Sequence, residues 1–220
     1  MASSVPSTAG SPLFPSPLYV ILDVEALAQA ALSPLTFLDA CLAAGARVFQ
    51  LRAKTWGAGA FADLAQAVMA RTAGTGAVVI INDRVDVALV TGASGAHVGQ
   101  ADLAPVAARA QLGAHAILGV STHSEAQVRA AISEPVSYIA VGPVFETATK
   151  VTGYSAVGLA LVTHARALAG SLCPVVGIGG ITPANAPDVI AAGADAVAVI
   201  GGVMGPDPCA LVSRYLDRLA

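Results

Sequence analysis

The stretch CPVVGIGGITPANAPDVIAAGADAVAVIGG, residues 173–202, contains one complete strand–helix–strand unit. An apolar run at 174–178 is followed by glycines and then by an Ala-rich segment with helical spacing at 184–193. A second apolar run, 196–200, again ends at a pair of glycines. Short strands that are apolar on both faces are typical of a parallel sheet covered by helices. This stretch therefore predicts a parallel β-α-β unit.

The same alternation of strand and helix recurs along the chain. Eight β-rich runs are expected, at 18–22, 47–51, 77–81, 95–99, 116–120, 138–142, 174–178 and 196–200. Eight such units within 220 residues predict a single-domain α/β fold, the (β/α)8 TIM barrel, over residues 18–220. A doubly wound open sheet is the alternative.

The chain is unusually apolar, with 55% hydrophobic and 11% charged residues, which raises the question of a membrane protein. The longest uncharged run after the N-terminus, between Arg166 and Asp188, is interrupted by three prolines and several glycines, unlike a spanning helix. Residues 1–17 are rich in Ser and Pro and lack Lys and Arg, so we expect a disordered tail and no signal peptide. No membrane association is expected.

Charge and cysteine content limit the partners further. A net charge of −3 and a pI of about 5.7 give no basic patch for a nucleic-acid backbone, so we expect no nucleic-acid partner. Cys41, Cys173 and Cys209 are far apart and form no C-x-x-C pair, which argues against a disulfide framework and a zinc site. They suit a cytoplasmic location. Small-molecule substrates are the expected partners, and the oligomeric state stays open, a homo-oligomer included.

The active site of a (β/α)8 barrel lies at the carboxyl ends of its strands. After the second run, QLRAK places Gln50, Arg52 and Lys54 at alternating positions, so that all three can share one face. Solvated loop charges are the plainer alternative. The chain has only two lysines, Lys54 and Lys150, however, and this scarcity favours a function for each.

Aspartates follow the third and fourth runs. Each has a structural alternative: Asp83 as a helix N-cap with Asp86 at the third helical position, and Asp102 as the cap of a helix near Leu103. In a barrel the two loops are neighbours, so both carboxylates can reach one ion. Mg²⁺ is commonly held by one or two carboxylates together with substrate phosphate and water. The pair therefore predicts a Mg²⁺ site.

The loop after the fifth run reads STHS. Ser124 with Gln127 predicts a capping box, which leaves Ser121 and Thr122 free to donate hydrogen bonds into the cleft. His123 in such a turn is more often structural, and we assign it no role.

The last three loops have the composition of anion sites. GPVFETATK brings the hydroxyls of Thr147 and Thr149 and the charge of Lys150, which suits phosphate. GIGGIT at 177–182 and IGGVMG at 200–205 would let backbone amides approach a phosphate, although tight packing could explain one glycine pair. Two anion sites are thus expected, the stronger one near the predicted metal, which suggests a pyrophosphate.

Seven segments together resemble the thiamine phosphate synthase family: QLRAK, INDRVDVAL, GAHVGQADL, LGVSTHS, VGPVFETATK, GIGGIT and GADAVAVIGG. The resemblance runs from about Leu18 to the C-terminal helix. It implies a (β/α)8 barrel and a transferase that joins hydroxymethylpyrimidine pyrophosphate to thiazole phosphate. The products would be thiamine monophosphate and pyrophosphate, and Mg²⁺ would assist a dissociative substitution.

The resemblance also implies residue roles. The pyrimidine pyrophosphate would contact Gln50, Leu51, Arg52, Ala53, Lys54, Asn82, Ser121 and Lys150. The thiazole phosphate would contact Thr147, Ala148, Thr149, Gly180, Ile200 and Gly201. Asp83 and Asp102 would hold Mg²⁺, and the catalytic residues would be Arg52, Ser121 and Lys150.

Three positions depart from the family pattern. Gly201 stands where a serine is common, Ala53 where a polar side chain is expected, and VTGYSAVG at 151–158 is an apolar version of a mobile loop. A related branch, the thiazole tautomerase, is the first alternative. The Asn82-Asp83 pair and Pro143, which that branch usually alters, favour the synthase. A non-catalytic phosphate binder on the same scaffold is the second alternative.

Overall fold

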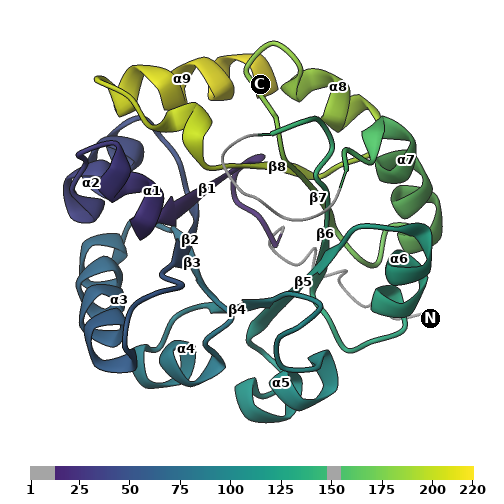
Figure 1. The fold of residues 1–220 in the computed structure, drawn as a ribbon, viewed down its shortest axis with the longest axis horizontal. Coiled ribbons are helices and arrows are strands. Elements are labelled where there is room, and N and C mark those ends of the chain that lie inside the picture. Colours follow the sequence, from purple (N-terminus) through teal and green to yellow (C-terminus); the bar gives the residue numbers. More distant parts are fainter. Residues whose placement is uncertain (1–12, 148–154) are drawn as a thin grey trace, which may run out of the picture.

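A computed structural model describes residues 13–147 and 155–220 of the chain. In this part, eight parallel strands close into a barrel in chain order, with helices around the outside (Figure 1). The strands are β1 (Leu18–Asp23), β2 (Val48–Arg52), β3 (Val78–Asn82), β4 (Gly95–Val98), β5 (Ile117–Thr122), β6 (Tyr138–Val141), β7 (Val175–Ile178) and β8 (Ala196–Val199). Each predicted run overlaps one of them, with ends that differ by at most two residues.

The helices follow the strands as the sequence predicts. They are α1 (Val24–Gln29), α2 (Pro34–Ala43), α3 (Ala58–Thr72), α4 (Val85–Thr91), α5 (Pro105–Leu112), α6 (Glu125–Ile132), α7 (Gly158–Ala169), α8 (Ala186–Ala191) and α9 (Pro208–Leu219), with a 3-10 turn η1 at Gly201–Val203. The pairing of β1 with β8, in which Tyr19 lies opposite Ala198, closes the barrel and excludes the open-sheet alternative. Within the described residues no helix is long and apolar enough to cross a membrane.

Strand side chains point alternately into the barrel and towards the helices, and both directions are apolar. The outer layer between strands and helices includes Leu18, Val20 and Leu22 of β1. The inner layer, inside the barrel, includes Tyr19 and Ile21 of the same strand. Two buried layers account for the high hydrophobic content without a membrane.

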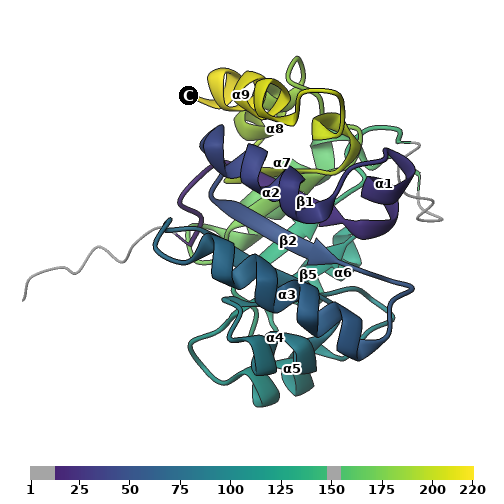
Figure 2. The ribbon, with the colours of Figure 1, turned by 90° about the vertical axis from the view of Figure 1, so that its left-hand side faces the viewer.

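Phe14 closes the inner layer at the amino ends of the strands. Its ring centroid lies 5.9 Å from that of Tyr19 and 5.1 Å, edge to face, from that of Tyr138. In Figure 2 the chain before β1 lies at the end opposite to the one towards which β2 points. Of the predicted tail, residues 1–12 lie outside the described part, whereas Phe14 and Ser16 are buried. The barrel body therefore begins earlier than the predicted boundary at Leu18.

Of three N-cap residues considered from the sequence, the structure shows one, Ser124, in that position and the other two elsewhere. Ser124 Oγ accepts from the Gln127 N–H at 3.3 Å, which confirms Ser124 as the cap. The return bond of the predicted capping box differs, because Gln127 Oε1 accepts from the N–H of His123 at 2.7 Å and not from that of Ser124. The capping alternatives for Asp83 and Asp102 are wrong, because Arg84 and Ala104 hold the N-cap positions of α4 and α5. Both carboxylates lie before the helices and are left for other contacts.

Gly119 in β5 makes room for the inner aromatic layer. A Cβ added there would lie 2.1 Å from a ring carbon of Tyr138. We expect Gly119→Ala to lower the free energy of unfolding by about 2 kcal/mol, because the ring has to shift within a packed layer. Gly59→Ala is the control, since an added Cβ there meets no atom within 4 Å and α3 favours alanine. Urea unfolding of both variants measures the difference, and equal stabilities would contradict this account of Gly119.

Candidate active site at the carboxyl ends of the strands

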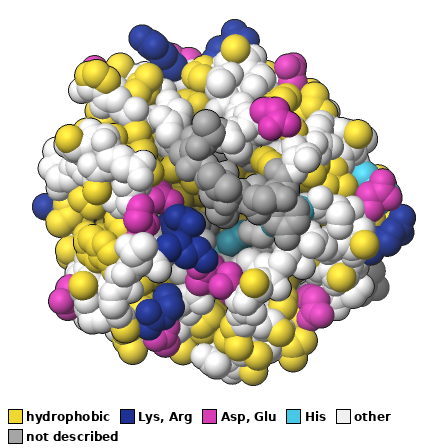
Figure 3. All heavy atoms as spheres, in the orientation of Figure 1, with side chains coloured by type: hydrophobic (Ala, Val, Ile, Leu, Met, Phe, Trp, Pro, Cys, Tyr) yellow, Lys and Arg dark blue, Asp and Glu magenta, His cyan; other side chains and the backbone are white. Residues whose placement is uncertain are grey.

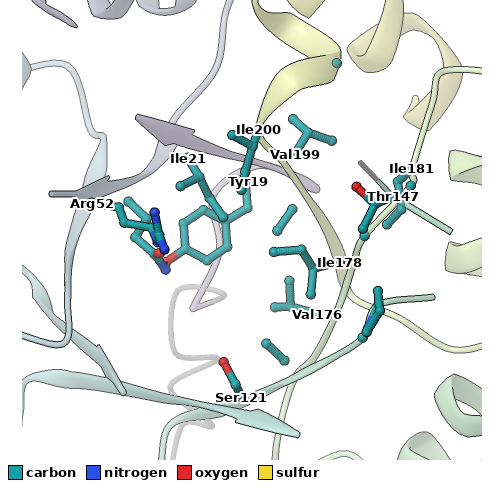
Figure 4. Close-up of a pocket in the computed structure, with 18 of the residues that line it drawn as sticks. Tyr19, Ile21, Arg52, Ser121, Thr147, Val176, Ile178, Ile181, Val199 and Ile200 are labelled. Carbon is teal, nitrogen blue, oxygen red and sulfur yellow. The ribbon is translucent and has the colours of Figure 1, made fainter. Parts of the chain in front are cut away.

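A central pocket opens where the strands end. This end of the barrel is turned to the viewer in Figures 1 and 3. Figure 4 shows Arg52 and Tyr19 on one side of it, Val176 and Ile178 on another, and Ser121 across from Ile200. Eight of the predicted site residues line this pocket: Gln50, Arg52, Asn82, Ser121, Thr147, Gly180, Ile200 and Gly201. The structure thus brings together residues from both predicted substrate sites.

Two of the predicted substrate-binding residues, Leu51 and Ala53, do not line the pocket. Leu51 is buried in the outer layer, and Ala53 packs against that layer from a partly buried position. The cause is the alternation of strand side chains, which turns Gln50 inward and Leu51 outward. Three predicted residues of the loop after β6, Ala148, Thr149 and Lys150, lie outside the described residues.

Arg52 is held at the pocket by Asp23, which the sequence did not single out. Asp23 Oδ2 forms an ion pair with Arg52 Nη1, and Asp23 Oδ1 accepts the Ala26 N–H at 3.0 Å as the N-cap of α1. Both side chains are largely buried. Arg52 Nε is also buried and has no hydrogen-bond partner within the described structure. The guanidinium is therefore fixed by one carboxylate and still has a donor to offer.

Asp83 and Asp102 meet beside the pocket. Asp83 has a left-handed φ of 60°, and its N–H donates to the His97 carbonyl at 2.7 Å. Its carboxylate forms an ion pair with Lys54 and lies within hydrogen-bonding contact of Asp102, while Asp102 Oδ2 accepts the Gly99 N–H at 2.9 Å. Figure 3 shows acidic and basic side chains gathered beside the grey segment at the centre of this face.

The two carboxyl groups shift each other's pKa in opposite directions. Burial is the largest cause that raises the pKa of Asp83, and Asp102 raises it further against the effect of Lys54. Burial acts to raise the pKa of Asp102 too, but hydrogen bonds from Asp83 and from the Gly99 N–H lower it overall. A proton shared between close carboxylates marks a place suited to a cation. Within the described residues no cluster of three or more His, Cys, Asp or Glu side chains could hold a metal.

A polar chain of five side chains lies at the bottom of the pocket. Gln50 Nε2 donates to Tyr19 Oη at 3.0 Å, and Tyr19 Oη lies 3.0 Å from Tyr138 Oη. Tyr138 Oη lies 2.8 Å from His97 Nδ1, and His97 Nε2 lies 2.8 Å from Ser121 Oγ. Sequence reasoning missed Tyr19, His97 and Tyr138. Their position inside strands, at the inward parity, was the available signal.

Packing explains one of the two glycine pairs. Gly179 and Gly180 have φ values of 100° and 64°, and a Cβ on Gly180 would lie 2.5 Å from the Glu146 carbonyl oxygen. The loop after β6 is bound to this turn by the Phe145 N–H, which donates to the Gly179 carbonyl at 3.0 Å. At the other pair, Gly201 lines the pocket at the start of η1. Its backbone is accessible to a ligand, without the hydroxyl that a serine would add.

His123 also lines the pocket. Its Nδ1 donates to the Gly142 carbonyl at 2.6 Å, because a carbonyl oxygen can only accept. This contact ties the loop after β5 to the loop after β6. The structural interpretation of His123 is thereby supported.

The fold and the location of the pocket define the class of the protein. Eight parallel strands with their carboxyl ends around one pocket, lined by polar side chains from β2, β3, β4 and β5, are the arrangement of a (β/α)8-barrel enzyme.

Comparison with known proteins then identifies the family. The family model described as thiamine monophosphate synthase matches residues 18–203, and the chain belongs to this family. It is 42% identical over 202 residues to the thiamine-phosphate synthase of Laribacter hongkongensis, covering 92% of this chain and 94% of the relative. It is 41% identical to that of Roseiflexus castenholzii, covering 98% and 95%. The solved thiamine phosphate pyrophosphorylase of Pyrococcus furiosus matches with a TM-score of 0.82 and 27% identity, covering 92% of this chain and 94% of that one.

The double role of Asp23 can be separated by substitution. Asp23→Asn keeps a side-chain oxygen for the cap of α1 but leaves Arg52 without its buried ion-pair partner, so we expect a loss of about 2 kcal/mol in unfolding free energy. Asp23→Ala should lose about 1 kcal/mol more, because the cap is lost as well. Urea unfolding of both variants measures this difference. Equal losses would show that the cap contributes nothing.

Proposed function

We propose that this chain joins an aminopyrimidine carrying a methyl pyrophosphate group to a thiazole phosphate, releasing pyrophosphate and forming thiamine monophosphate. The observation that carries the proposal is the composition of the central pocket. Arg52, Asn82 and the backbone at Gly180 and Gly201 line it, and Asp83, which follows Asn82 directly, is paired with Asp102 beside it. This arrangement suits two phosphorylated substrates bound side by side. Family membership supports the same reaction.

The aminopyrimidine would lie over the polar chain. Gln50 and Ser121 expose amide and hydroxyl groups to the pocket from opposite ends of this chain, and Asn82 lines the pocket nearby. Such groups can pair with the amino group and the ring nitrogens of a pyrimidine. The resemblance of the QLRAK and STHS segments to the family assigns the same substrate to them.

The pyrophosphate would lie at the charged corner. Arg52 is held by Asp23 with one donor without a partner, and Lys54 stands beside Asp83. The family resemblance adds Lys150, which lies outside the described residues. Fixed cations at a leaving group stabilise the negative charge that grows there, and they need no reorganisation during the reaction.

A divalent cation fits the two aspartates. Asp83 and Asp102 are in contact, and the pair shares one lysine, Lys54, which forms an ion pair with Asp83. Mg²⁺ commonly uses one or two carboxylates and completes its shell with water and substrate phosphate. Asp83 and Asp102 would hold it, and when bound it would neutralise charge on the pyrophosphate.

The proposed coupling reaction depends on stabilisation of charge more than on proton transfer. The bond from the pyrimidine methylene to the pyrophosphate oxygen breaks, and its electron pair leaves with pyrophosphate. The thiazole nitrogen carries no proton and donates its lone pair to the methylene carbon, so this step needs no general base. Arg52 and Lys150 would stabilise the leaving group, and Ser121 would hold the pyrimidine. Thr147, Ala148, Thr149, Gly180, Ile200 and Gly201 would position the thiazole phosphate.

The wider proposal concerns partners and location. We expect two small-molecule substrates, neither nucleic acid nor membrane as partner, and a cytoplasmic location. The three cysteines are free thiols, which suits a reducing compartment.

Asp83→Asn tests the carboxylate pair. Purified protein is incubated with pyrimidine pyrophosphate, thiazole phosphate and Mg²⁺, and thiamine phosphate is measured by its fluorescence after oxidation. We expect product from the wild type and at least about 10²-fold less from Asp83→Asn, because one ligand charge is lost. Calorimetric titration with Mg²⁺ should show weaker binding in the same variant. Asp86→Asn is the matched control, because Asp86 forms an exposed pair with Arg84 away from the pocket.

The same assay separates the alternatives. Wild-type protein that gives no thiamine phosphate but isomerises the thiazole phosphate alone would be a tautomerase. Binding of thiazole phosphate without any turnover would indicate a phosphate binder.

Lys150→Ala tests the assignment that rests on the resemblance. Removal of one preorganised charge contact at a leaving group typically costs about 10²- to 10³-fold in rate, and we expect kcat to fall by this factor. Single-turnover measurements of product formation give the rate of the chemical step. A wild-type rate in Lys150→Ala would remove this residue from the mechanism.

A further inference from the structure

The loop between β2 and α3, residues 53–57, is attached to a side chain from α1. Lys54, Thr55 and Trp56 make no backbone-to-backbone hydrogen bond within the described structure. Instead, Glu25 Oε1 accepts both the N–H and the hydroxyl of Thr55, each at 2.9 Å. One carboxylate oxygen thus binds both of these donors of Thr55.

The register of the barrel places Glu25 beside this loop. Asp23, the last residue of β1, lies opposite Arg52, the last residue of β2. Because α1 begins directly after Asp23, Glu25 stands in its first turn, next to the residues that follow Arg52. Asp23 binds the guanidinium of Arg52. Glu25 binds Thr55, so that Lys54 stands between two attachments.

A carboxylate at this place has an electrostatic cost for the binding of an anion. Glu25 Oε2 lies 4.0 Å from Arg52 Nη1, so its charge counteracts part of the attraction of Arg52 for a pyrophosphate. Burial acts to raise the pKa of Glu25, but the hydrogen bonds from Thr55 lower it overall, so the group is ionised at neutral pH. A charged group with this cost needs a compensating role, and its contact with Thr55 indicates one.

We propose that Glu25 is a positioning residue, whose double hydrogen bond to Thr55 holds the loop after β2 so that Lys54 stays at the pyrophosphate. The inference rests on the proposed function for the identity of this ligand. Lys54 needs such support, because its side chain is 45% exposed and carries its charge on a flexible stem. A cation held in advance stabilises a leaving group without reorganisation. Glu25 does not line the pocket, and it acts through the loop without touching the substrate.

Glu25→Ala and Glu25→Gln separate the hydrogen bonds from the charge. In Glu25→Gln the amide oxygen can still accept both donors of Thr55, whereas Glu25→Ala removes the attachment. We expect Glu25→Ala to raise KM for the pyrimidine pyrophosphate about tenfold, the equivalent of one charge-assisted hydrogen bond, and to leave KM for the thiazole phosphate within about twofold. Glu25→Gln should keep both KM values within about threefold of the wild type.

Two kinetic outcomes would overturn the proposal. A Glu25→Gln variant as impaired as Glu25→Ala would assign the effect to the charge beside Arg52. Equal changes of both KM values in Glu25→Ala would indicate general damage to the barrel.

The fluorescence of Trp56 supplies a second measurement, which needs neither substrate nor turnover. Trp56 is the single tryptophan of the chain, follows Thr55 directly and is 41% exposed, so its signal reports on this loop. In Glu25→Ala its anisotropy should fall and its quenching by acrylamide should rise, because the loop has lost its attachment. Glu25→Gln should give the wild-type signals. Unchanged signals in Glu25→Ala would show that the loop keeps its place without Glu25, and the proposal would fail.

Glu125→Ala is the matched control. Glu125 stands in the first turn of α6, as Glu25 does in α1, and α6 lies across the barrel from α1 in Figure 1. The substitution removes the same charge from the same helical position, so we expect wild-type KM values and wild-type Trp56 signals. Equal effects of Glu125→Ala and Glu25→Ala would count against the proposal.

The two measurements also separate this proposal from the proposed function. A wild-type protein that forms no product, together with Trp56 signals that change only in Glu25→Ala, would contradict the proposed function and leave the attachment of the loop by Glu25 intact. Product formation with wild-type kinetics in Glu25→Ala would do the reverse.

Discussion

The pairing of β1 with β8 is the interaction on which the rest of the molecule depends. Leu18, Tyr19 and Val20 lie opposite Val197, Ala198 and Val199, and this ladder joins the first strand to the last. Closure places the loops of β7 and β8 across one pocket from the ends of β2, β3 and β4. Two sites that are far apart in the sequence thereby become neighbours. An open sheet of the same strands would leave them at opposite edges.

A barrel this apolar needs its few polar groups to be satisfied inside. The inner layer contains two tyrosines, a histidine and a glutamine, all buried. Unpaired polar groups in such a place are costly, whereas a fully connected network is tolerated and gives the interior one fixed arrangement. The polar chain meets this condition, since each member has a partner on both sides or faces the pocket. Stability and ligand recognition are therefore served by the same hydrogen bonds.

The sequence predicts the strands well, because short apolar runs separated by Ala-rich helices have little else to form. It also predicts eight of the residues that line the pocket, since these lie near or after the carboxyl ends of strands. The side chain of Leu51 is turned outward by the alternation along β2, and that of Ala53 packs against the outer layer, which the motif alone does not reveal. Tyr138 and Tyr19 could not be joined from sequence, because 119 positions separate them and only barrel closure brings them together. Asp23 was missed for a similar reason: its partner Arg52 stands on the next strand.

Phe14 has a practical consequence for joining other polypeptides to this chain. Its ring anchors the segment before β1 under the inner layer, at the end of the barrel away from the pocket. A fused domain or an affinity tag joined before Phe14 would therefore emerge from the barrel on the face opposite the pocket. An immobilised form attached through that side would therefore present its open face to the solution.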